Sequence, residues 1–238
     1  MAPLNRRAAF LLAAAFTLIG AAPHRAGAIR ADDPVRIRSV DVGAFPNVDV
    51  TVSTAKASEL TPKDLTVTEN GHPVGGVTVK PLDSTGTSVD VVLALDVSGS
   101  MRGGPLGSAI AAALKFVTTL PPGGTRVGIV TFSDRAKIVQ PLTTDRSHAL
   151  QSLGSLQARG ETALYDAITT ASRMFIGPAQ RNLVVLSDGK DTASKGKLQT
   201  AIVSSRSRHI TVFSVGLQGA ETDIGALRKI AERTGGSY

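Results

Sequence analysis

The sequence predicts an α/β fold in which a mostly parallel, doubly wound sheet is covered by helices on both faces. Nearly continuous apolar runs alternate with amphipathic stretches at helical spacing, which is typical of parallel strands joined by crossover helices. Hydrophobic residues make up 42% of the 238 residues and charged residues 19%, so the chain can bury a core and is neither disordered nor fibrous. The absence of cysteine excludes disulfides, thiolate metal sites and a cysteine nucleophile.

The first 28 residues have the features of a secretory signal peptide. Arg6 and Arg7 precede an apolar run over residues 8–22, and residues 26–28 (Ala-Gly-Ala) have the small-residue spacing of a signal-peptidase site. We expect cleavage after Ala28 and a secreted or cell-envelope location. A retained membrane anchor is the alternative, because the apolar run is short for a bilayer span but can be extended.

The basic charge of the chain does not indicate nucleic-acid binding. The formal net charge of +7 falls to +4 without the leader, which leaves 23 basic against 19 acidic residues. The remaining basic residues are scattered, with few aromatic residues between them to stack on bases. Past residue 30 no segment is long and apolar enough to span a bilayer, so we expect membrane contact only through the leader or a C-terminal extension.

Residues 34–82 are predicted to form a small β-module. Apolar and polar residues alternate at Val48, Val50 and Val52, and the pair Asn70-Gly71 between two apolar runs is typical of a β-hairpin. The predicted strands are residues 35–42, 48–54, 65–69 and 74–80. A linker rich in Ser, Thr and Gly over residues 83–88 leads into a second domain, predicted over residues 88–238.

The second domain carries the alternating pattern in order along the chain. Its apolar runs predict parallel strands over residues 89–95, 127–132, 183–186 and 210–215. An antiparallel edge strand is predicted over residues 136–139, after a tight turn. Apolar residues recur at helical spacing over residues 106–117, 150–156, 164–171 and 224–230, with Pro105 expected to open the first helix.

Oxygen-bearing side chains directly follow two of the predicted parallel strands. Asp96, Ser98 and Ser100 follow the first strand at a spacing that points three side chains the same way from an extended loop. Asp188 follows the third parallel strand, and Thr162 precedes a predicted helix. Because ligands of open parallel sheets bind outside the carboxyl ends of the strands, we expect these five residues to converge on one edge.

A set of oxygen ligands suits a hard divalent cation, Mg²⁺ first and Mn²⁺ or Ca²⁺ as substitutes. If the hydroxyls of Ser98, Ser100 and Thr162 touch the ion while Asp96 and Asp188 act mainly through waters, the ion keeps much of its positive charge. Such an ion can accept one more anionic oxygen, and the Asp or Glu carboxylate of a partner protein is the obvious donor. Each residue alone is an ordinary loop or cap residue, so the metal hypothesis depends on the whole set.

These five positions, in the order Asp-x-Ser-x-Ser, Thr and Asp, resemble the metal-ion-dependent adhesion site of von Willebrand factor type A domains. The resemblance covers about residues 88–238 and includes residues 127–133 and 186–189. It implies a Rossmann-like domain, a divalent ion held at the five positions, and the binding of protein ligands.

Two features depart from the family pattern. Glu161 stands where relatives often have a glycine, so its carboxylate could screen the ion beside Thr162 or take the open coordination position. The chain stops at residues 234–238, where relatives usually continue through another strand and helix, so we expect the natural chain to continue.

Three functional hypotheses follow. The leading one is an exported, non-enzymatic module that binds a protein partner. The alternative is an assembly component of a cell-envelope or pilus-type complex with a structural ion, because the small β-module resembles a segment of exported bacterial proteins, some of which have parts similar to tight-adherence pilus-assembly proteins. The third, a metal-dependent hydrolase, lacks an identifiable base or nucleophile, since Ser100 is not in a Gly-x-Ser-x-Gly motif.

Overall fold

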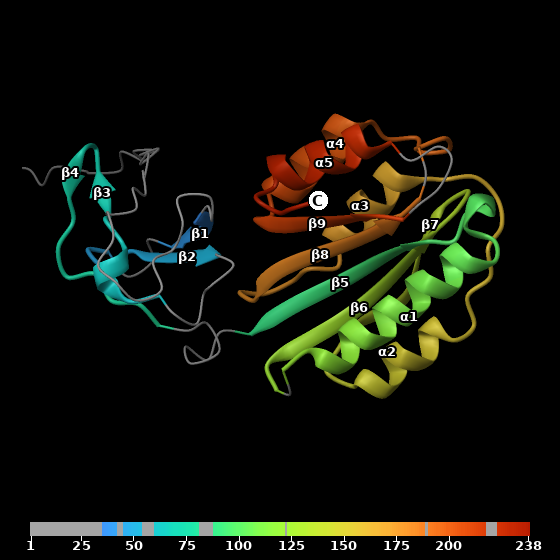
Figure 1. The fold of residues 1–238 in the computed structure, drawn as a ribbon, viewed down its shortest axis with the longest axis horizontal. Coiled ribbons are helices and arrows are strands. Elements are labelled where there is room, and N and C mark those ends of the chain that lie inside the picture. Colours follow the sequence, from blue (N-terminus) through green and yellow to red (C-terminus); the bar gives the residue numbers. More distant parts are fainter. Residues whose placement is uncertain are drawn as a thin grey trace, which may run out of the picture. The chain divides into compact units, whose positions relative to one another are not determined.

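The computed structural model describes residues 35–41, 45–53, 60–80, 88–121, 123–188, 190–217 and 223–238. The predicted signal peptide and linker residues 83–87 lie outside this range. The chain divides into two compact units (Figure 1). Within the described residues, no helix combines the length and the apolar character needed to cross a membrane.

Two small two-stranded sheets occur before residue 80. They are formed by β1 (Arg36–Asp41) with β2 (Asp49–Ser53), and by β3 (Thr68–Glu69) with β4 (His72–Pro73). The predicted Asn70-Gly71 hairpin is confirmed, since Glu69 pairs antiparallel with His72 across the turn. Both turn residues have positive φ, 52° and 82°, as a two-residue hairpin turn requires.

The prediction of a strand over residues 74–80 is wrong. The Val74 N–H still donates to the Val67 carbonyl at 2.8 Å, but no strand follows within the described residues up to 80. Gly75-Gly76 comes next, and Gly76 has a φ of 72°, which an extended strand does not allow. The alternation of valines along this segment therefore did not indicate a strand.

The larger unit is built on a five-stranded sheet in the order β7-β6-β5-β8-β9 (Figure 1). Its strands are β5 (Val89–Asp96), β6 (Thr125–Phe132), β7 (Ala136–Thr143), β8 (Gln180–Ser187) and β9 (Ile210–Gly216). The pairs of β5 with β6, β5 with β8 and β8 with β9 are parallel, whereas β7 pairs antiparallel with β6. The predicted doubly wound, mostly parallel sheet and its antiparallel edge strand are confirmed.

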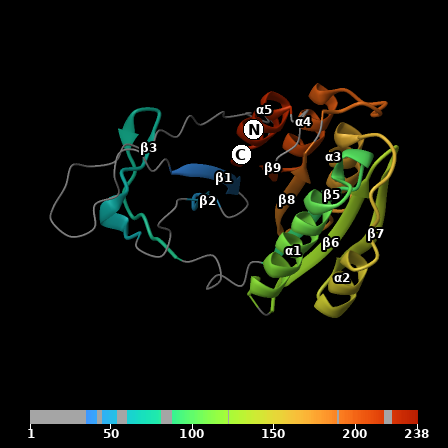
Figure 2. The same ribbon diagram turned by 45° about the vertical axis from the view of Figure 1, so that its right-hand side comes forward.

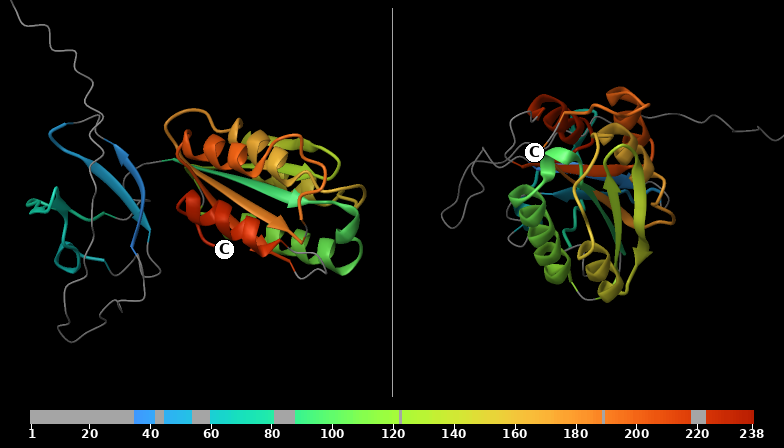
Figure 3. Two further views of the ribbon diagram at one scale, coloured as in Figure 1. Left: turned by 90° about the horizontal axis from the view of Figure 1, so that it is seen from above. Right: turned by 90° about the vertical axis from the view of Figure 1, so that its right-hand side faces the viewer.

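Helices cover both faces of this sheet, as Figures 2 and 3 show from other directions. They are α1 (Gly104–Thr119), α2 (Arg146–Leu153), α3 (Leu164–Ser172), α4 (Leu198–Arg206) and α5 (Ile224–Arg233). Val91, Leu93 and Leu95 of β5 pack in one core cluster with residues of α1 and α2. Val92 and Ala94 pack in another with residues of α3, α4 and α5. A strand buried on both faces explains the continuous apolar run in the sequence.

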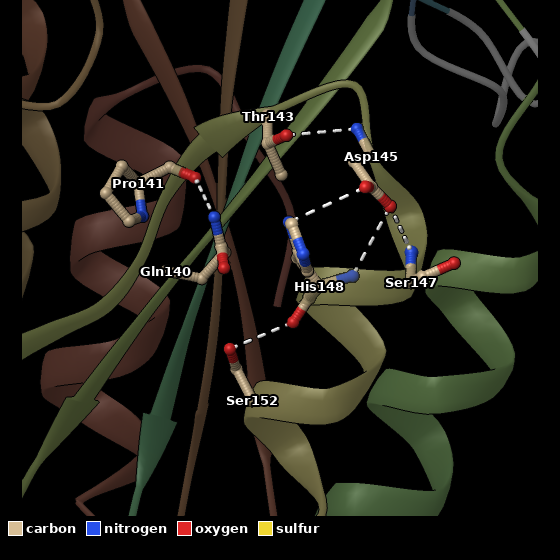
Figure 4. A network of polar contacts seen from close by, with 7 residues as sticks. All are labelled: Gln140, Pro141, Thr143, Asp145, Ser147, His148 and Ser152. Carbon is tan, nitrogen blue, oxygen red and sulfur yellow. Dashed lines mark hydrogen bonds and ion pairs between the residues drawn. The ribbon is translucent and has the colours of Figure 1, made fainter.

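Helix α2 begins earlier and ends earlier than predicted, so Leu156 lies beyond it. Figure 4 shows the cause at its start, where the Asp145 carboxylate accepts from the Ser147 and His148 N–H groups at 2.9 and 3.4 Å. The Asp145 N–H in turn donates to Thr143 Oγ1 at 3.0 Å. Asp145 is therefore the N-cap, a position that aspartate favours because its side chain satisfies free helix N–H groups.

Helix α4 is not predicted by the apolar periodicity of the sequence. Its buried face combines Ala201 and Ile202 with Ser205, which is fully buried. The Ser205 hydroxyl donates to the Ala201 carbonyl at 3.0 Å and lies 3.3 Å from the Ser172 hydroxyl of α3. A helix face built from small and polar residues gives little apolar periodicity.

A partly buried ion pair lies near the start of β5 and β6. The Asp90 side chain has no exposed surface, and Arg126, its register neighbour, donates to both carboxylate oxygens at 2.7 Å. Arg126 also donates to the Ile176 carbonyl at 3.0 Å. Hydrogen bonding to Asp90 raises the pKa of Arg126 above its usual value. Asp90 therefore lies inside the otherwise apolar run over residues 89–95, and Arg126 directly precedes the run over residues 127–132.

Candidate metal centre

The candidate site lies where the strand order reverses. From β5 the chain passes to β6 on one side and later to β8 on the other, so the carboxyl ends of β5 and β8 flank a switch point of the sheet. Leu95 and Leu186 are register partners, which puts Asp96 and Ser187 next to each other. Asp188 is the residue directly after Ser187. Open α/β sheets bind their ligands at such positions.

A chain of hydrogen bonds joins four of the five predicted site residues. Asp96 Oδ2 accepts from the Ser187 hydroxyl at 2.5 Å, and Asp96 Oδ1 accepts from the Ser98 N–H at 2.8 Å. The Ser98 and Ser100 hydroxyls lie 3.0 Å apart, and Ser100 Oγ donates to Asp188 Oδ1 at 2.9 Å. Asp96, Ser98 and Asp188 are buried, whereas Ser100 is exposed.

Backbone hydrogen bonds hold the fifth residue, Thr162, next to these four hydrogen-bonded residues. The Gly99 N–H donates to the Gly160 carbonyl at 2.8 Å, and a Cβ on Gly99 would lie 3.2 Å from that oxygen, so the approach favours glycine. The Thr162 N–H donates to Thr192 Oγ1 at 3.0 Å. The Thr162 carbonyl accepts from the Thr192 and Ala193 N–H groups at 2.9 and 3.1 Å.

Glu161 is exposed and tied to the same loop as Thr162. Its Oε2 accepts from the Thr192 hydroxyl at 2.8 Å, while its N–H donates to Asp134 Oδ1 at 2.8 Å. Gly160 makes this possible, because it has a φ of 77° and its Cα lies so close to Asp134 that a Cβ would clash. The Glu161 carboxylate therefore has a defined hydrogen-bond partner beside Thr162.

Two acidic residues near the site hold its loops rather than face solvent. The Asp166 oxygens accept from the Lys195 and Gly196 N–H groups at 2.9 Å. Asp191 accepts from the Ser194 hydroxyl at 2.5 Å and from the Tyr165 N–H at 3.2 Å. Spatial proximity, not a sequence pattern, creates these contacts between α3 and the loop that follows Asp188.

The electrostatics of the site favour the addition of a cation. Burial raises the pKa of Asp96, and the nearby charge of Asp188 acts in the same direction, while hydrogen bonds from Ser187 and Ser98 lower it. Within the described part of the chain, no basic side chain forms an ion pair with Asp96. Two buried carboxylates in one place are costly without compensating positive charge.

The donor set fits a hard divalent cation in its chemistry. All five predicted residues offer oxygen, the donor that Mg²⁺, Mn²⁺ and Ca²⁺ prefer. Across the described residues, no three His, Cys, Asp or Glu side chains gather around a common point. Hydroxyls supply three of the five predicted donors, and a divalent ion would keep part of its charge if the two carboxylates act mainly through waters.

Comparison with known proteins agrees with this architecture. The von Willebrand factor type A domain family matches residues 90–238. A multiple-serine variant of an aerotolerance-related membrane protein from Bacteroides fragilis is 25% identical, with a TM-score of 0.57 over 63% of this chain and 90% of that chain. A von Willebrand factor type A structure from Catenulispora acidiphila is 27% identical, with a TM-score of 0.58 over 71% of this chain and 38% of that chain.

BatB from Bacteroides thetaiotaomicron shares the fold at 23% identity, with a TM-score of 0.56 over 63% of this chain and 89% of that chain. A search of curated proteins finds no significant match. The family match covers more than half of the chain and includes every residue of the candidate site. The chain belongs to the von Willebrand factor type A domain family.

Proposed function

We propose that this protein is an exported, non-enzymatic module that binds a protein partner through a divalent cation. The observation that carries the proposal is the hydrogen-bonded chain from Asp96 through Ser98 and Ser100 to Asp188, at the switch point of the sheet. Ser100 is the exposed member of this hydrogen-bonded series, and a partner can approach the site there.

The five residues have different roles in this proposal. Ser98, Ser100 and Thr162 supply neutral hydroxyls, while Asp96 and Asp188 supply the negative charge that attracts a cation. Mg²⁺ is the expected ion, and Mn²⁺ or Ca²⁺ can substitute. When bound, the cation would offer a positive centre to an Asp or Glu carboxylate of the partner. No bond is broken in this proposal, and Ser100 does not stand in the Gly-x-Ser-x-Gly motif of a hydrolase nucleophile.

Export is supported by the sequence and by one relative. Residues 1–28 have the pattern of a signal peptide, and the similar protein from Bacteroides fragilis is described as a membrane protein. We propose that the mature chain begins near Ile29 and acts in the cell envelope or outside the cell.

Titration calorimetry of Mg²⁺ and Mn²⁺ tests the metal site. We expect the parent protein to bind one ion with weak to moderate affinity, because neutral hydroxyls hold an ion less tightly than a cage of carboxylates. Asp96→Ala and Asp188→Ala should abolish binding, whereas Glu232→Ala, which removes an exposed carboxylate of α5, should not. Unchanged ion uptake in either site variant would refute the assignment.

A structural role for the ion is the second candidate, because the site joins three separate loops and an ion there could also hold the fold together. Chelation separates the two candidates. If EDTA abolishes capture of a partner from cell-envelope extract while the melting transition persists, the ion serves docking. If EDTA unfolds the domain, the ion serves the fold, and the protein is better described as an assembly component.

A further inference from the structure

A pocket of about 730 Å³ opens beside the candidate metal centre. We name it the basic groove and define it by three basic residues, Arg135, Lys137 and Arg159, and by the wall residues Val97, Asp134 and Leu156. It lies in the larger unit, at the turn between β6 and β7 and against the loop that leads from α2 to α3.

Backbone hydrogen bonds join the basic groove to the metal centre. Val97, between Asp96 and Ser98, accepts at its carbonyl from the Arg159 N–H at 2.8 Å. The next residue after Arg159 is Gly160, whose carbonyl accepts from Gly99. The backbone that lines the groove is therefore bonded directly to the backbone of the candidate metal centre, so the two sites are neighbours.

The positive charge of the basic groove is only partly compensated. Arg135, Lys137 and Arg159 are exposed, and their side chains make no ion pair with any described residue. Asp134 is the one acidic residue that lines the groove, and its Oδ1 already accepts from the Glu161 N–H. Three positive charges against one hydrogen-bonded carboxylate make the groove complementary to an anionic chain.

We propose that the basic groove holds an acidic peptide segment of the protein partner, in which further Asp or Glu residues flank the carboxylate at the cation. This inference rests on the proposed function, since it extends the ligand from one carboxylate to a run of them. The groove contributes its own charge-dependent part of the binding, and this part persists when the cation is removed. An array of basic residues also raises the rate at which an acidic partner associates.

Fluorescence anisotropy with two peptides tests the proposal. One probe is labelled hexaglutamate, and the other is a labelled Gly-Gly-Asp-Gly-Gly peptide with blocked termini, which presents a single carboxylate. A groove variant combines Arg135→Ala, Lys137→Ala and Arg159→Ala. A control variant of equal charge combines Lys115→Ala, Arg206→Ala and Lys229→Ala, three exposed residues that do not line the groove. Each protein is measured with Mg²⁺ and with EDTA.

We expect the groove variant to bind hexaglutamate about tenfold more weakly, as the loss of three exposed ion pairs would produce, and to bind the single-carboxylate peptide unchanged. The control variant should match the parent. Equal weakening in both variants, no effect of the groove variant, or no binding of hexaglutamate to the parent would overturn the groove. If the groove effect is present but Mg²⁺ and EDTA give the same affinities, the groove stands and the metal-dependent function fails.

Discussion

Asp96 has opposing consequences for stability and for ion binding. Burial disfavours the charged form of Asp96, whereas the proposed cation requires the charged form. We therefore expect Asp96→Asn to raise the melting temperature of the EDTA-treated protein, because the substitution removes a buried charge and keeps a similar shape. The same variant should lose the stabilisation that Mg²⁺ gives the parent. Calorimetric melts of both proteins, with Mg²⁺ and with EDTA, measure the two effects.

The pH dependence provides a check on Asp96. Because its pKa is raised in the folded state, this group makes the EDTA-treated protein more stable as the pH falls from the raised pKa toward the ordinary value of 3.8, and adds nothing further below it. Asp96→Asn removes this contribution. Melting temperatures of parent and variant that run parallel between pH 7 and pH 4 would contradict the account.

The Asp90–Arg126 pair predicts an asymmetry between its two members. Arg126→Met leaves the fully buried Asp90 without its cation and should cost about 3 kcal/mol. Asp90→Asn should cost only about 1 kcal/mol, because the Arg126 side chain is 32% exposed and can reach water. Urea unfolding measures both. The control is Arg181→Met, since Arg181 donates to the Gly177 and Arg208 carbonyls instead of a carboxylate. Equal costs for the pair, or the reverse order, would refute this view.

Glu161 is the residue that departs from the family pattern beside the site. Since its carboxylate is exposed and bonded to Thr192, it can act on the ion only as a partly screened charge. We expect Glu161→Gly to weaken Mg²⁺ binding about threefold, the effect of one exposed charge, and to strengthen capture of the single-carboxylate peptide. Calorimetry and anisotropy measure the two. Parent-like values in both would mean that Glu161 does not affect the site.

At the scale of elements, the loop that follows Asp188 depends on the N-terminal end of α3. Asp166→Ala removes the acceptor for the Lys195 and Gly196 N–H groups, so their amide hydrogen exchange should accelerate about tenfold. Asp223→Ala removes the cap of α5, where Asp223 Oδ1 accepts from Ala226, and serves as the control. Unchanged exchange at residues 195 and 196 would show that the loop is held by other contacts.

The sequence predicts the elements that have a strong apolar periodicity. The predictions fail where a buried polar residue or a glycine turn determines the local structure. Continuous apolar runs correctly predict the four parallel strands, because both faces of the sheet are covered. Helix α4 was missed because its buried face includes Ser205, and the end of α2 was misplaced. The strand over residues 74–80 failed because Gly76 turns the chain. Short-range alternation alone does not fix a strand.

Part of the candidate site can be predicted from the sequence, and part of it cannot. Asp96, Ser98 and Ser100 form a local pattern that can be read directly, and the position of Asp188 follows from the rule for parallel sheets. The roles of Asp134, Asp166 and Asp191 depend on contacts between residues about 25 to 30 positions apart, which no local pattern encodes. The single sequence therefore predicts the centre of the site but not its supporting loops.

In the whole molecule, the proposed binding face combines the edge of the sheet, the proposed cation and the adjacent basic groove. In this proposal the cation has a coordination position which a carboxylate can take. Glu161 and the groove only adjust how strongly that position attracts an acidic ligand. The claim therefore requires a measurement on the ion itself.

Water-proton relaxation of the Mn²⁺-loaded protein is that measurement, because relaxivity depends on water bound directly to the ion. The account predicts high relaxivity for the loaded parent and a saturable fall as the Gly-Gly-Asp-Gly-Gly peptide is added, when its carboxylate replaces water. The same peptide with Asn in place of Asp should have no effect, and Asp188→Ala should not bind Mn²⁺. Relaxivity that stays constant at a peptide concentration where anisotropy shows full binding would contradict the account.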